Sequence, residues 1–175
     1  KIGLAAWARH GAVIALGNIG NRRAVPALIQ ALEHHSEHVR SEAVRGLAKM
    51  GDQQAVEPLV EVMRQDEDDV VRRDAAMALR TLAVQSSEVA EALRGALRDR
   101  WWEVRAEAAR ALGRIDDPES VDALLGALED SSYTVSTSAE HALANLGRLA
   151  LPSLLAAAAT ATGPHLAPVM RCLRE

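Results

Sequence analysis

The sequence has 175 residues, of which 49% are hydrophobic and only 2% aromatic, with no phenylalanine. A core made from this sequence must consist of Ala, Leu, Val and Ile, which favours closely packed helices over strands rich in aromatic residues. The formal net charge is -4, from 20 basic and 24 acidic residues, which argues against a general nucleic-acid-binding protein, because such proteins usually carry a basic excess.

The cysteine content and the lack of long apolar runs indicate the compartment. Cys172 is the single cysteine, so no internal disulfide can form, which suits a reducing environment. No apolar run approaches the roughly 20 residues of a membrane span, and residues 1–11 lack the order of a signal peptide. We therefore expect a cytoplasmic protein that does not contact a membrane. The absence of an initiator Met indicates a fragment of a longer chain.

Copies of one nine-residue pattern, called the frame below, recur along the chain. An apolar first residue, a small fifth residue and a ninth-position Leu return at steps of about 31 to 33 residues. Positions i, i+4 and i+8 share one face of a helix, so each copy predicts a helix with one buried stripe. The copies are residues 8–16, 39–47, 71–79, 104–112 and 135–143.

A second set of apolar residues at helical spacing lies between the copies, so each repeat is predicted to hold two helices. Helix stop and start signals separate the helices, and a longer link, residues 83–87, follows the third copy. The second stripe consists of Val25, Leu28 and Leu32; Val56, Leu59 and Met63; Leu93 and Leu97; Val121, Leu124 and Leu128; Leu151, Leu154 and Leu155. The signals are Gly20-Asn21, Gly51-Asp52 and Asp116-Asp117-Pro118, the last with Pro at the first helical position.

A helix pair of this kind cannot bury its stripe alone, whereas stacked pairs form a continuous core. We therefore predict an all-α fold, a right-handed α-solenoid of about five helix pairs in a single domain over residues 1–175. Residues 164–175 fit the frame poorly and are expected to form a terminal cap or a truncated repeat. The pairs are expected near residues 4–33, 37–65, 69–98, 102–129 and 133–160.

The repeated residues resemble the HEAT-like repeats of the phycobilisome-lyase type over nearly the whole chain. The resemblance implies that the frame helices line the concave face of the solenoid and the intervening helices the convex face. Such repeats occur in scaffolds, adaptors, bilin lyase subunits and appended domains of enzymes, so the fold does not specify the function. The resemblance is carried by Val39-Arg40, Ala43, Leu47, Met50-Gly51-Asp52, Ala55-Val56 and Pro58-Leu59, and by Val104-Arg105, Ala108-Ala109 and Ala111-Leu112-Gly113.

One Arg and one Asp recur in register with the frame. These residues could form a binding stripe or a ladder between successive repeats. The ladder, which is typical of this family, is favoured, because the planar guanidinium group of Arg can bind loop carbonyls and carboxylates. His34 takes the Asp slot before Val39 and Ser136 the Arg slot of the fifth copy, so weaker ladders are expected at both ends. The predicted ladder consists of Arg40, Arg72 and Arg105 with Asp66, Asp99 and Asp130.

The frame leaves other positions of these helices free, and we expect them to face the groove. Trp, Tyr, Arg and Met are enriched at interface hot spots, which favours recognition of a partner there. For either Trp101 or Trp102, filling a gap between repeats is an equally good interpretation. Val70 and Asp74 are expected on the same face. The predicted partner-binding residues are Trp7, His10, His38, Glu42, Arg45, Arg73, Met77, Trp102, Glu107, Arg110, Arg114, Tyr133 and His141.

Metal, cofactor and catalytic chemistry are not predicted. Three histidines and two glutamates within residues 33–38 have side chains of the type that binds zinc or nickel, but the cluster occurs once and Ser36 is typical of an N-cap. Deoxyhypusine hydroxylase, an enzyme built on this repeat, holds iron with His-Glu dipeptides, and this sequence contains none. No serine or cysteine nucleophile has a matching His and acid at a recognisable spacing.

The sequence therefore predicts a non-catalytic scaffold that binds a protein partner, as a monomer or with weak self-association. The alternative is a part of an enzyme: a bilin lyase component, or a tRNA-contacting tail, because residues 15–18 resemble the carboxy-terminal repeats of epoxyqueuosine reductases. A third hypothesis is DNA binding in the manner of HEAT-like alkylpurine DNA glycosylases. It rests on the arginines between positions 94 and 114, but Asp99, Glu103 and Glu107 interleave with them and would repel phosphates.

Overall fold

The computed structural model describes residues 3–160 and 166–172, with side chains placed for residues 11–159 and 169–172. Throughout these residues the regular secondary structure is helical, as predicted. The contacts divide the chain into two compact units, residues 1–82 (unit 1) and 83–175 (unit 2).

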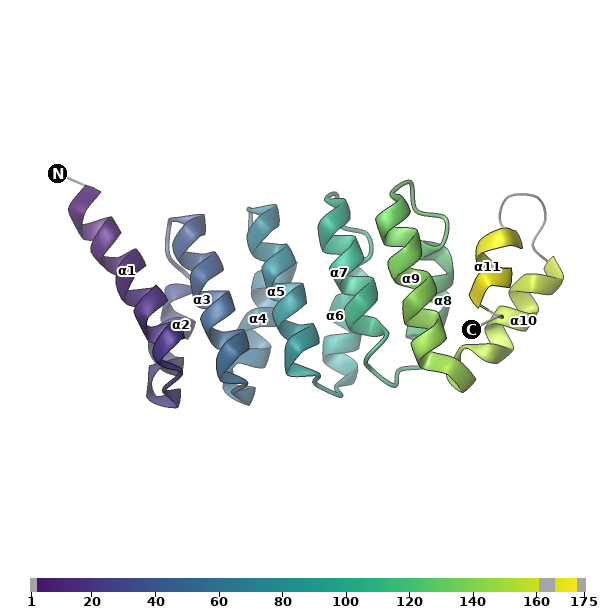
Figure 1. Ribbon diagram of the computed structural model, residues 1–175, viewed down its shortest axis with the longest axis horizontal. Coiled ribbons are helices and arrows are strands. Elements are labelled where there is room, and N and C mark those ends of the chain that lie inside the picture. Colours follow the sequence, from purple (N-terminus) through teal and green to yellow (C-terminus); the bar gives the residue numbers. More distant parts are fainter. Residues whose placement is uncertain (1–2, 161–165, 173–175) are drawn as a thin grey trace. The chain divides into compact units, whose positions relative to one another are not determined.

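Unit 1 contains five α-helices in its described part. They are α1 (Gly3–Ile19), α2 (Val25–Ala31), α3 (Glu37–Met50), α4 (Val56–Gln65) and α5 (Asp69–Leu82). Short 3₁₀ helices, η1 (Arg22–Ala24) and η2 (Gln53–Ala55), precede α2 and α4. The frame helices α1, α3 and α5 lie side by side, with the intervening helices α2 and α4 behind them (Figure 1).

Unit 2 begins with the link expected at residues 83–87 and has the same arrangement of two layers. The frame helices α7 and α9 lie side by side, the intervening helices α6 and α8 pack behind them, and the last helix, α11, packs on α9 and α10 (Figure 1). A 3₁₀ helix, η3 (Gly147–Leu149), precedes α10. The α-helices are α6 (Ser87–Ala96), α7 (Trp102–Leu112), α8 (Ser120–Ala127), α9 (Tyr133–Leu146), α10 (Leu151–Thr160) and α11 (Leu166–Cys172).

The frame stripe forms the core of both units. In the second to fifth copies, the first, fifth and ninth frame residues are at most 2% exposed. Each buried Val or Leu contributes about 1.5 to 3 kcal/mol relative to an exposed one. The first copy differs, because Ala12 is exposed and Leu16 is half-buried. No helix in the described part of the chain covers the side of α1 that carries Ala12 and Leu16. Val13 and Gly17 of α1 are buried instead.

The second stripe is buried in most repeats but not in the last. Leu154 is 3% exposed, whereas Leu151 and Leu155 are 45% and 55% exposed. The prediction was wrong for these two leucines, because they share a face of α10 that no described helix covers. Val56 and Leu97 are half-buried rather than fully buried.

The helix boundaries follow the predicted signals in unit 1. Gly51 ends α3 with a φ of 64°, and the Asp52 side chain accepts the backbone N–H of Gln54 at 3.0 Å. Gly20 and Asn21 repeat this arrangement after α1. Such a left-handed residue followed by an N-cap is a common way to end one helix and begin the next.

In unit 2 the predicted helix start at Pro118 was wrong. The helix α8 begins at Ser120, two residues later. Asp117, predicted as part of the capping signal, instead accepts a hydrogen bond from the Ser120 hydroxyl at 2.5 Å and is also paired with Arg94. Its carboxylate therefore binds side chains and does not cap a helix that starts at Pro118.

No single helix in the described ranges is long and apolar enough to cross a membrane. Only the joined segments Tyr133–Leu149 and Leu151–Ala159 meet the length and hydropathy criteria together, and they are bent by 114° at their junction.

A close helix approach in unit 2 involves Gly113, at the C-terminal end of α7, and provides a test of the packing. A Cβ atom at Gly113 would lie 2.6 Å from Cα and 2.8 Å from Cβ of Ala142 on α9. These atoms are backbone or fixed to it, so Gly113→Ala should force α7 and α9 apart and lower the free energy of unfolding by about 2 kcal/mol in urea denaturation. The control Gly95→Ala on α6 has open space and should be neutral or stabilising by up to about 1 kcal/mol. Equal effects of the two substitutions would contradict this packing.

The turn after α5 contains a strained residue. Ala83 has a φ of 48°, the left-handed conformation that Gly51 adopts after α3. Because an L side chain disfavours this conformation, Ala83→Gly should raise the free energy of unfolding by about 1 kcal/mol. Gly51→Ala should lower it by a similar amount, although its Cβ would meet no atom within 4 Å. A loss of stability in Ala83→Gly, measured by urea denaturation, would show that the turn has another conformation in solution.

Candidate functional site

The predicted ladder is present within unit 1. Arg40 on α3 donates from Nε to Asp66 Oδ2 at 2.7 Å and from Nη2 to Oδ1 at 2.8 Å, and Nη1 donates to the carbonyl of His34 at 2.9 Å. The two charged side chains are only 8% and 5% exposed. Asp66 therefore raises the pKa of Arg40, chiefly through this hydrogen bond. The pair joins the loop before α5 to the preceding frame helix.

Unit 2 contains the same bidentate pair. Arg105 donates to the two carboxylate oxygens of Asp130 at 2.7 and 2.8 Å, and to the carbonyl of Asp99 at 2.9 Å. The hydrogen bond from Arg105 lowers the pKa of Asp130, and the N–H of Ser132 lowers it further, against the opposing effect of burial. In unit 1, Arg72, the third predicted arginine of the ladder, donates to the carbonyl of Asp66 at 2.8 Å.

Each ladder Asp also fixes the turn in which it lies. One oxygen accepts the backbone N–H two residues later, at 2.8 to 2.9 Å; the pairs are Asp66 with Asp68, Asp99 with Trp101, and Asp130 with Ser132. Before the second copy His34 performs this task, since its Nδ1 accepts the N–H of Ser36 at 3.1 Å. Ser36 is the N-cap residue of α3, but its side chain makes no capping hydrogen bond. The hydrogen bond that His34 accepts in this turn therefore explains why a histidine can replace the Asp here.

Three of the predicted partner-binding residues of unit 1 line a shallow pocket. It has a volume of about 410 Å³, lies near the N-terminal ends of α3 and α5, and includes His38, Glu42 and Arg45. Val70, expected on this face, also lines it and is 39% exposed. The sequence did not point to the remaining lining residues. Ser41 lies at frame position three, Glu37 is the first residue of α3, and Asp68 lies in the turn before α5.

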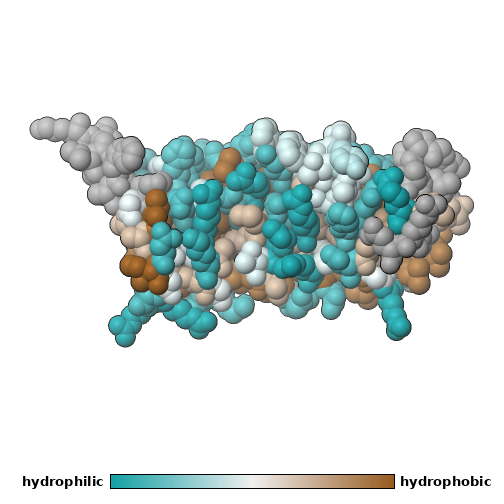
Figure 2. Space-filling view, viewed as in Figure 1, coloured by the Kyte–Doolittle hydropathy of each residue, from teal (hydrophilic) through white to brown (hydrophobic). Residues whose placement is uncertain are grey.

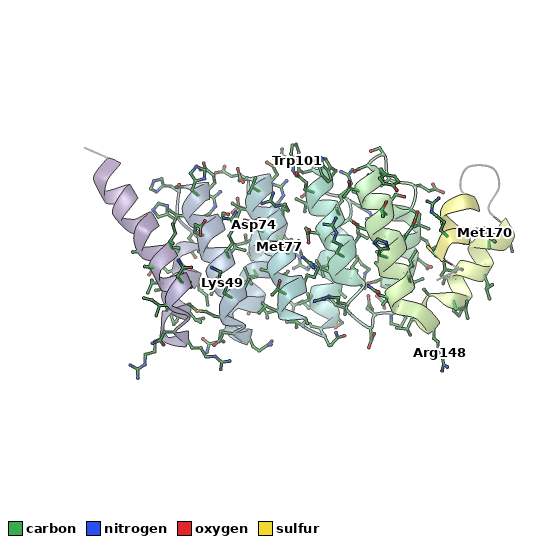
Figure 3. All side chains as sticks on the ribbon, in the orientation of Figure 1. Lys49, Asp74, Met77, Trp101, Arg148 and Met170 are labelled. Atoms are coloured by element: carbon green, nitrogen blue, oxygen red, sulfur yellow. The ribbon has the colours of Figure 1, made fainter. Side chains whose placement is uncertain are left out.

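Asp74 on α5 was expected to face the groove, and this prediction was wrong because its side chain is completely buried. Oδ2 accepts hydrogen bonds from the Ser41 hydroxyl at 2.7 Å and from Arg45 Nε at 3.0 Å, and Oδ1 accepts one from Arg73 Nη2 at 2.6 Å. These donors cover the carboxylate and compensate its loss of hydration. Asp74 therefore positions the two arginines, and Met77 lies half-buried one turn later on α5 (Figure 3).

In unit 2, aromatic side chains gather at the N-terminal ends of two adjacent frame helices. Trp101 is the N-cap residue of α7 and Trp102 its first residue, and they are 40% and 39% exposed. Tyr133 begins α9 and is 81% exposed. Figure 3 shows Trp101 at that end of α7. Neither tryptophan is buried in a gap between repeats. The rest of the frame-helix face of each unit is mainly hydrophilic in Figure 2.

The other predicted residues of unit 2 lie farther along these helices. Arg110 donates to Glu107 at 2.5 Å on the same face of α7, as Arg45 does to Glu42 at 2.9 Å on α3. Arg114 lies in the turn after α7, at the end opposite Trp102, so the structure does not bring these two together. His141 is exposed two turns into α9. The side chains of Trp7 and His10 lie outside the described residues.

Three of the arginines between positions 94 and 114 are bound to carboxylates. Arg94 pairs with Asp117 and with Glu119, the latter at 3.0 Å. Arg105 and Arg110 are bound to the carboxylates described above. Because the charges of these three arginines are already compensated, they offer little excess positive charge for phosphates.

The family is established by comparison with known sequences. The model of HEAT repeats matches residues 5–80, 76–144 and 90–165, which together span most of the chain. The chain belongs to the HEAT repeat family. Its resemblance to HEAT-like repeats and its all-α solenoid fold are therefore confirmed. No protein with a curated description matches the sequence.

Solved structures of similar fold come from proteins of different kinds. The complex of CpcE and CpcF of phycocyanin lyase from Nostoc sp. PCC7120 has a TM-score of 0.68 at 22% identity, covering 99% of this HEAT repeat chain and 72% of that chain. A designed armadillo repeat protein in complex with the peptide (KR)4 has a TM-score of 0.63 at 22% identity, over 94% and 91%. Human deoxyhypusine hydroxylase has a TM-score of 0.51 at 20% identity, over 98% and 80%. At these identities the similarity shows the fold alone.

The lowered pKa of Asp130 predicts how stability depends on pH. The folded state holds this carboxylate in its charged form, so its contribution is complete above the unfolded pKa of about 4 and is lost as the pH falls through the lower folded-state pKa. Asp130→Asn should lower the free energy of unfolding at pH 7 by about 1 to 2 kcal/mol. In urea denaturation the deficit should stay constant above about pH 5 and shrink below about pH 4. Asp122→Asn, an exposed control on α8, should show a much smaller deficit. A deficit of Asp130→Asn that did not change with pH would contradict this role of the charge.

Proposed function

We propose that this HEAT repeat chain is a non-catalytic scaffold that binds a protein partner through its frame helices. The observation that carries the proposal is the aromatic cluster of Trp101, Trp102 and Tyr133. These are three of the chain's four aromatic residues, and all three remain exposed at the N-terminal ends of α7 and α9. Exposed Trp and Tyr on a rigid support are the side chains that most often dominate binding energy at interfaces.

Charged residues held in place on the frame helices of each unit also support recognition of a peptide or protein. Arg110 and Glu107 are held against each other, and in unit 1 Arg45 is fixed by Glu42 and the buried Asp74. Side chains positioned in this way lose little conformational entropy on binding, which favours specificity. A peptide-bound designed armadillo repeat protein among the structures of similar fold is in keeping with this proposal.

In the experiment, peptides that bind the wild-type chain are selected from a random library. The affinity of the selected peptides is then measured by fluorescence anisotropy. The double variant Trp102→Ala/Tyr133→Ala should bind them at least tenfold more weakly, because tenfold corresponds to about 1.4 kcal/mol and hot-spot residues exceed this. Both side chains are exposed, so circular dichroism should show an unchanged helix content.

The matched control is Leu155→Ala, which removes another large exposed side chain from an intervening helix, α10. It should leave the affinity within about twofold of wild type. An equal loss in the control, or unchanged affinity in the double variant, would refute binding through the aromatic cluster.

The second candidate is a component of an enzyme, as the fold similarity to phycocyanin lyase suggests. Mixing the chain with a bilin and a phycobiliprotein distinguishes the two candidates. A coloured adduct that forms only in the presence of the chain would replace the scaffold proposal by the lyase-component proposal.

A further inference from the structure

A cleft with an apolar floor lies between the intervening helices α2 and α4 of unit 1. Its volume is about 530 Å³, and Ile29, Leu32, Pro58 and Val62 contribute its apolar part. Leu32 is buried at 6% exposure, and the other three are half-buried. The cleft therefore offers partly exposed apolar surface on the layer of unit 1 opposite its frame helices α3 and α5.

The rim of this cleft carries acidic side chains and no basic one. Glu33, Glu57 and Glu61 line it and are exposed. Among the described residues, no side-chain hydrogen bond or ion pair involves any of these three carboxylates. Asp66 also lines the cleft, but its carboxylate is already bound by Arg40. Three uncompensated negative charges therefore surround an apolar floor.

Two of these charges are placed where they destabilise the free protein. Glu61 lies one turn after Glu57 on α4, and like charges at this spacing repel each other. Glu33 follows Leu32, the C-cap of α2, where the helix carbonyls already give a negative potential. A cationic ligand would relieve both effects, so this arrangement favours binding of positive charge.

The equivalent cleft of unit 2 shows that this acidity is not a general property of the repeat. That cleft lies between α6 and α8, has a volume of about 650 Å³, and contains Arg94 and Arg98 beside Glu91 and Asp122. Its charges are mixed, whereas the cleft of unit 1 has one sign only. The comparison provides a matched control within the same molecule.

We propose that the α2/α4 cleft of unit 1 binds a short basic segment of another protein. An apolar side chain of the segment rests on Leu32 and Val62, and flanking Lys or Arg side chains pair with Glu33 and Glu61. Nucleic acid is excluded by its own negative charge, and a small cation would make no use of the apolar floor. This site is independent of the partner proposed for the frame helices.

The test uses the full chain and a fluorescein-labelled heptapeptide in which lysine alternates with leucine. Anisotropy should detect binding that weakens as the salt concentration rises from 50 to 300 mM, because the rim charges are exposed. Glu33→Gln/Glu61→Gln should weaken binding about tenfold, while Glu91→Gln/Asp122→Asn, which removes the same charge from the cleft of unit 2, should change it less than twofold. Equal losses in the two double variants would overturn the proposal, because they would show unspecific attraction by net charge.

Two further measurements separate this site from simple ion attraction. A peptide with serine in place of leucine should bind about tenfold more weakly, and equal binding would overturn the role assigned to the apolar floor. Without peptide, Glu61→Gln should raise Tm by about 1 to 2 °C, because it removes the repulsion from Glu57. A lower Tm in this variant would contradict the unfavourable charge placement on which the proposal rests.

Discussion

Each helix pair in this protein depends on its neighbours to bury the frame stripe. The stripe consists of Val, Ala and Leu, and the small central Ala allows adjacent frame helices to approach closely. Contact between Gly17 and Gly46 in unit 1, and between Gly113 and Ala142 in unit 2, brings helix backbones close together. A Cβ atom would be crowded at Gly17 or Gly46 and would clash at Gly113. A core of this kind lacks large aromatic side chains and gains its stability from many close contacts between layers.

The Arg–Asp pairs bind polar backbone groups that the stacking of helix pairs leaves near the core. Successive helix pairs leave loop carbonyls and turn N–H groups near the core, where unpaired polar groups are costly. Arg40 and Arg105 bind the loop carbonyls, and their Asp partners accept the turn N–H groups. Within each unit, one Arg–Asp pair therefore satisfies two loops at once, which explains why both residue types recur in phase with the frame.

The sequence predicted the helix pairs and most of the core, because the period of the apolar residues is imposed by helix geometry alone. It also predicted the ladder pairs, since the register of Arg40 and Asp66 repeats in Arg105 and Asp130. It was wrong for Ala12, Leu151 and Leu155, whose burial depends on whether a neighbouring helix is present, and a residue's own helix does not contain that information.

The candidate site was harder to predict than the fold. Asp74 occupies a frame position that looks free in the sequence, but donors from two different helices enclose it. Arg114 follows the helical spacing of its neighbours, yet α7 ends before it. The acidic cleft between α2 and α4 carries no motif, because it arises from residues about 30 positions apart that only stacking brings together.

The pairing of Glu42 with Arg45 and of Glu107 with Arg110 has a consequence for how quickly a partner can associate. Each pair places opposite charges on one turn of the same helix, so its field at a distance is that of a small dipole. Long-range steering accelerates association only where a surface presents excess charge of one sign. A partner that docks on these helices should therefore associate at the unsteered rate of about 10⁵ to 10⁶ M⁻¹s⁻¹, and the lifetime of the complex should depend on the aromatic contacts.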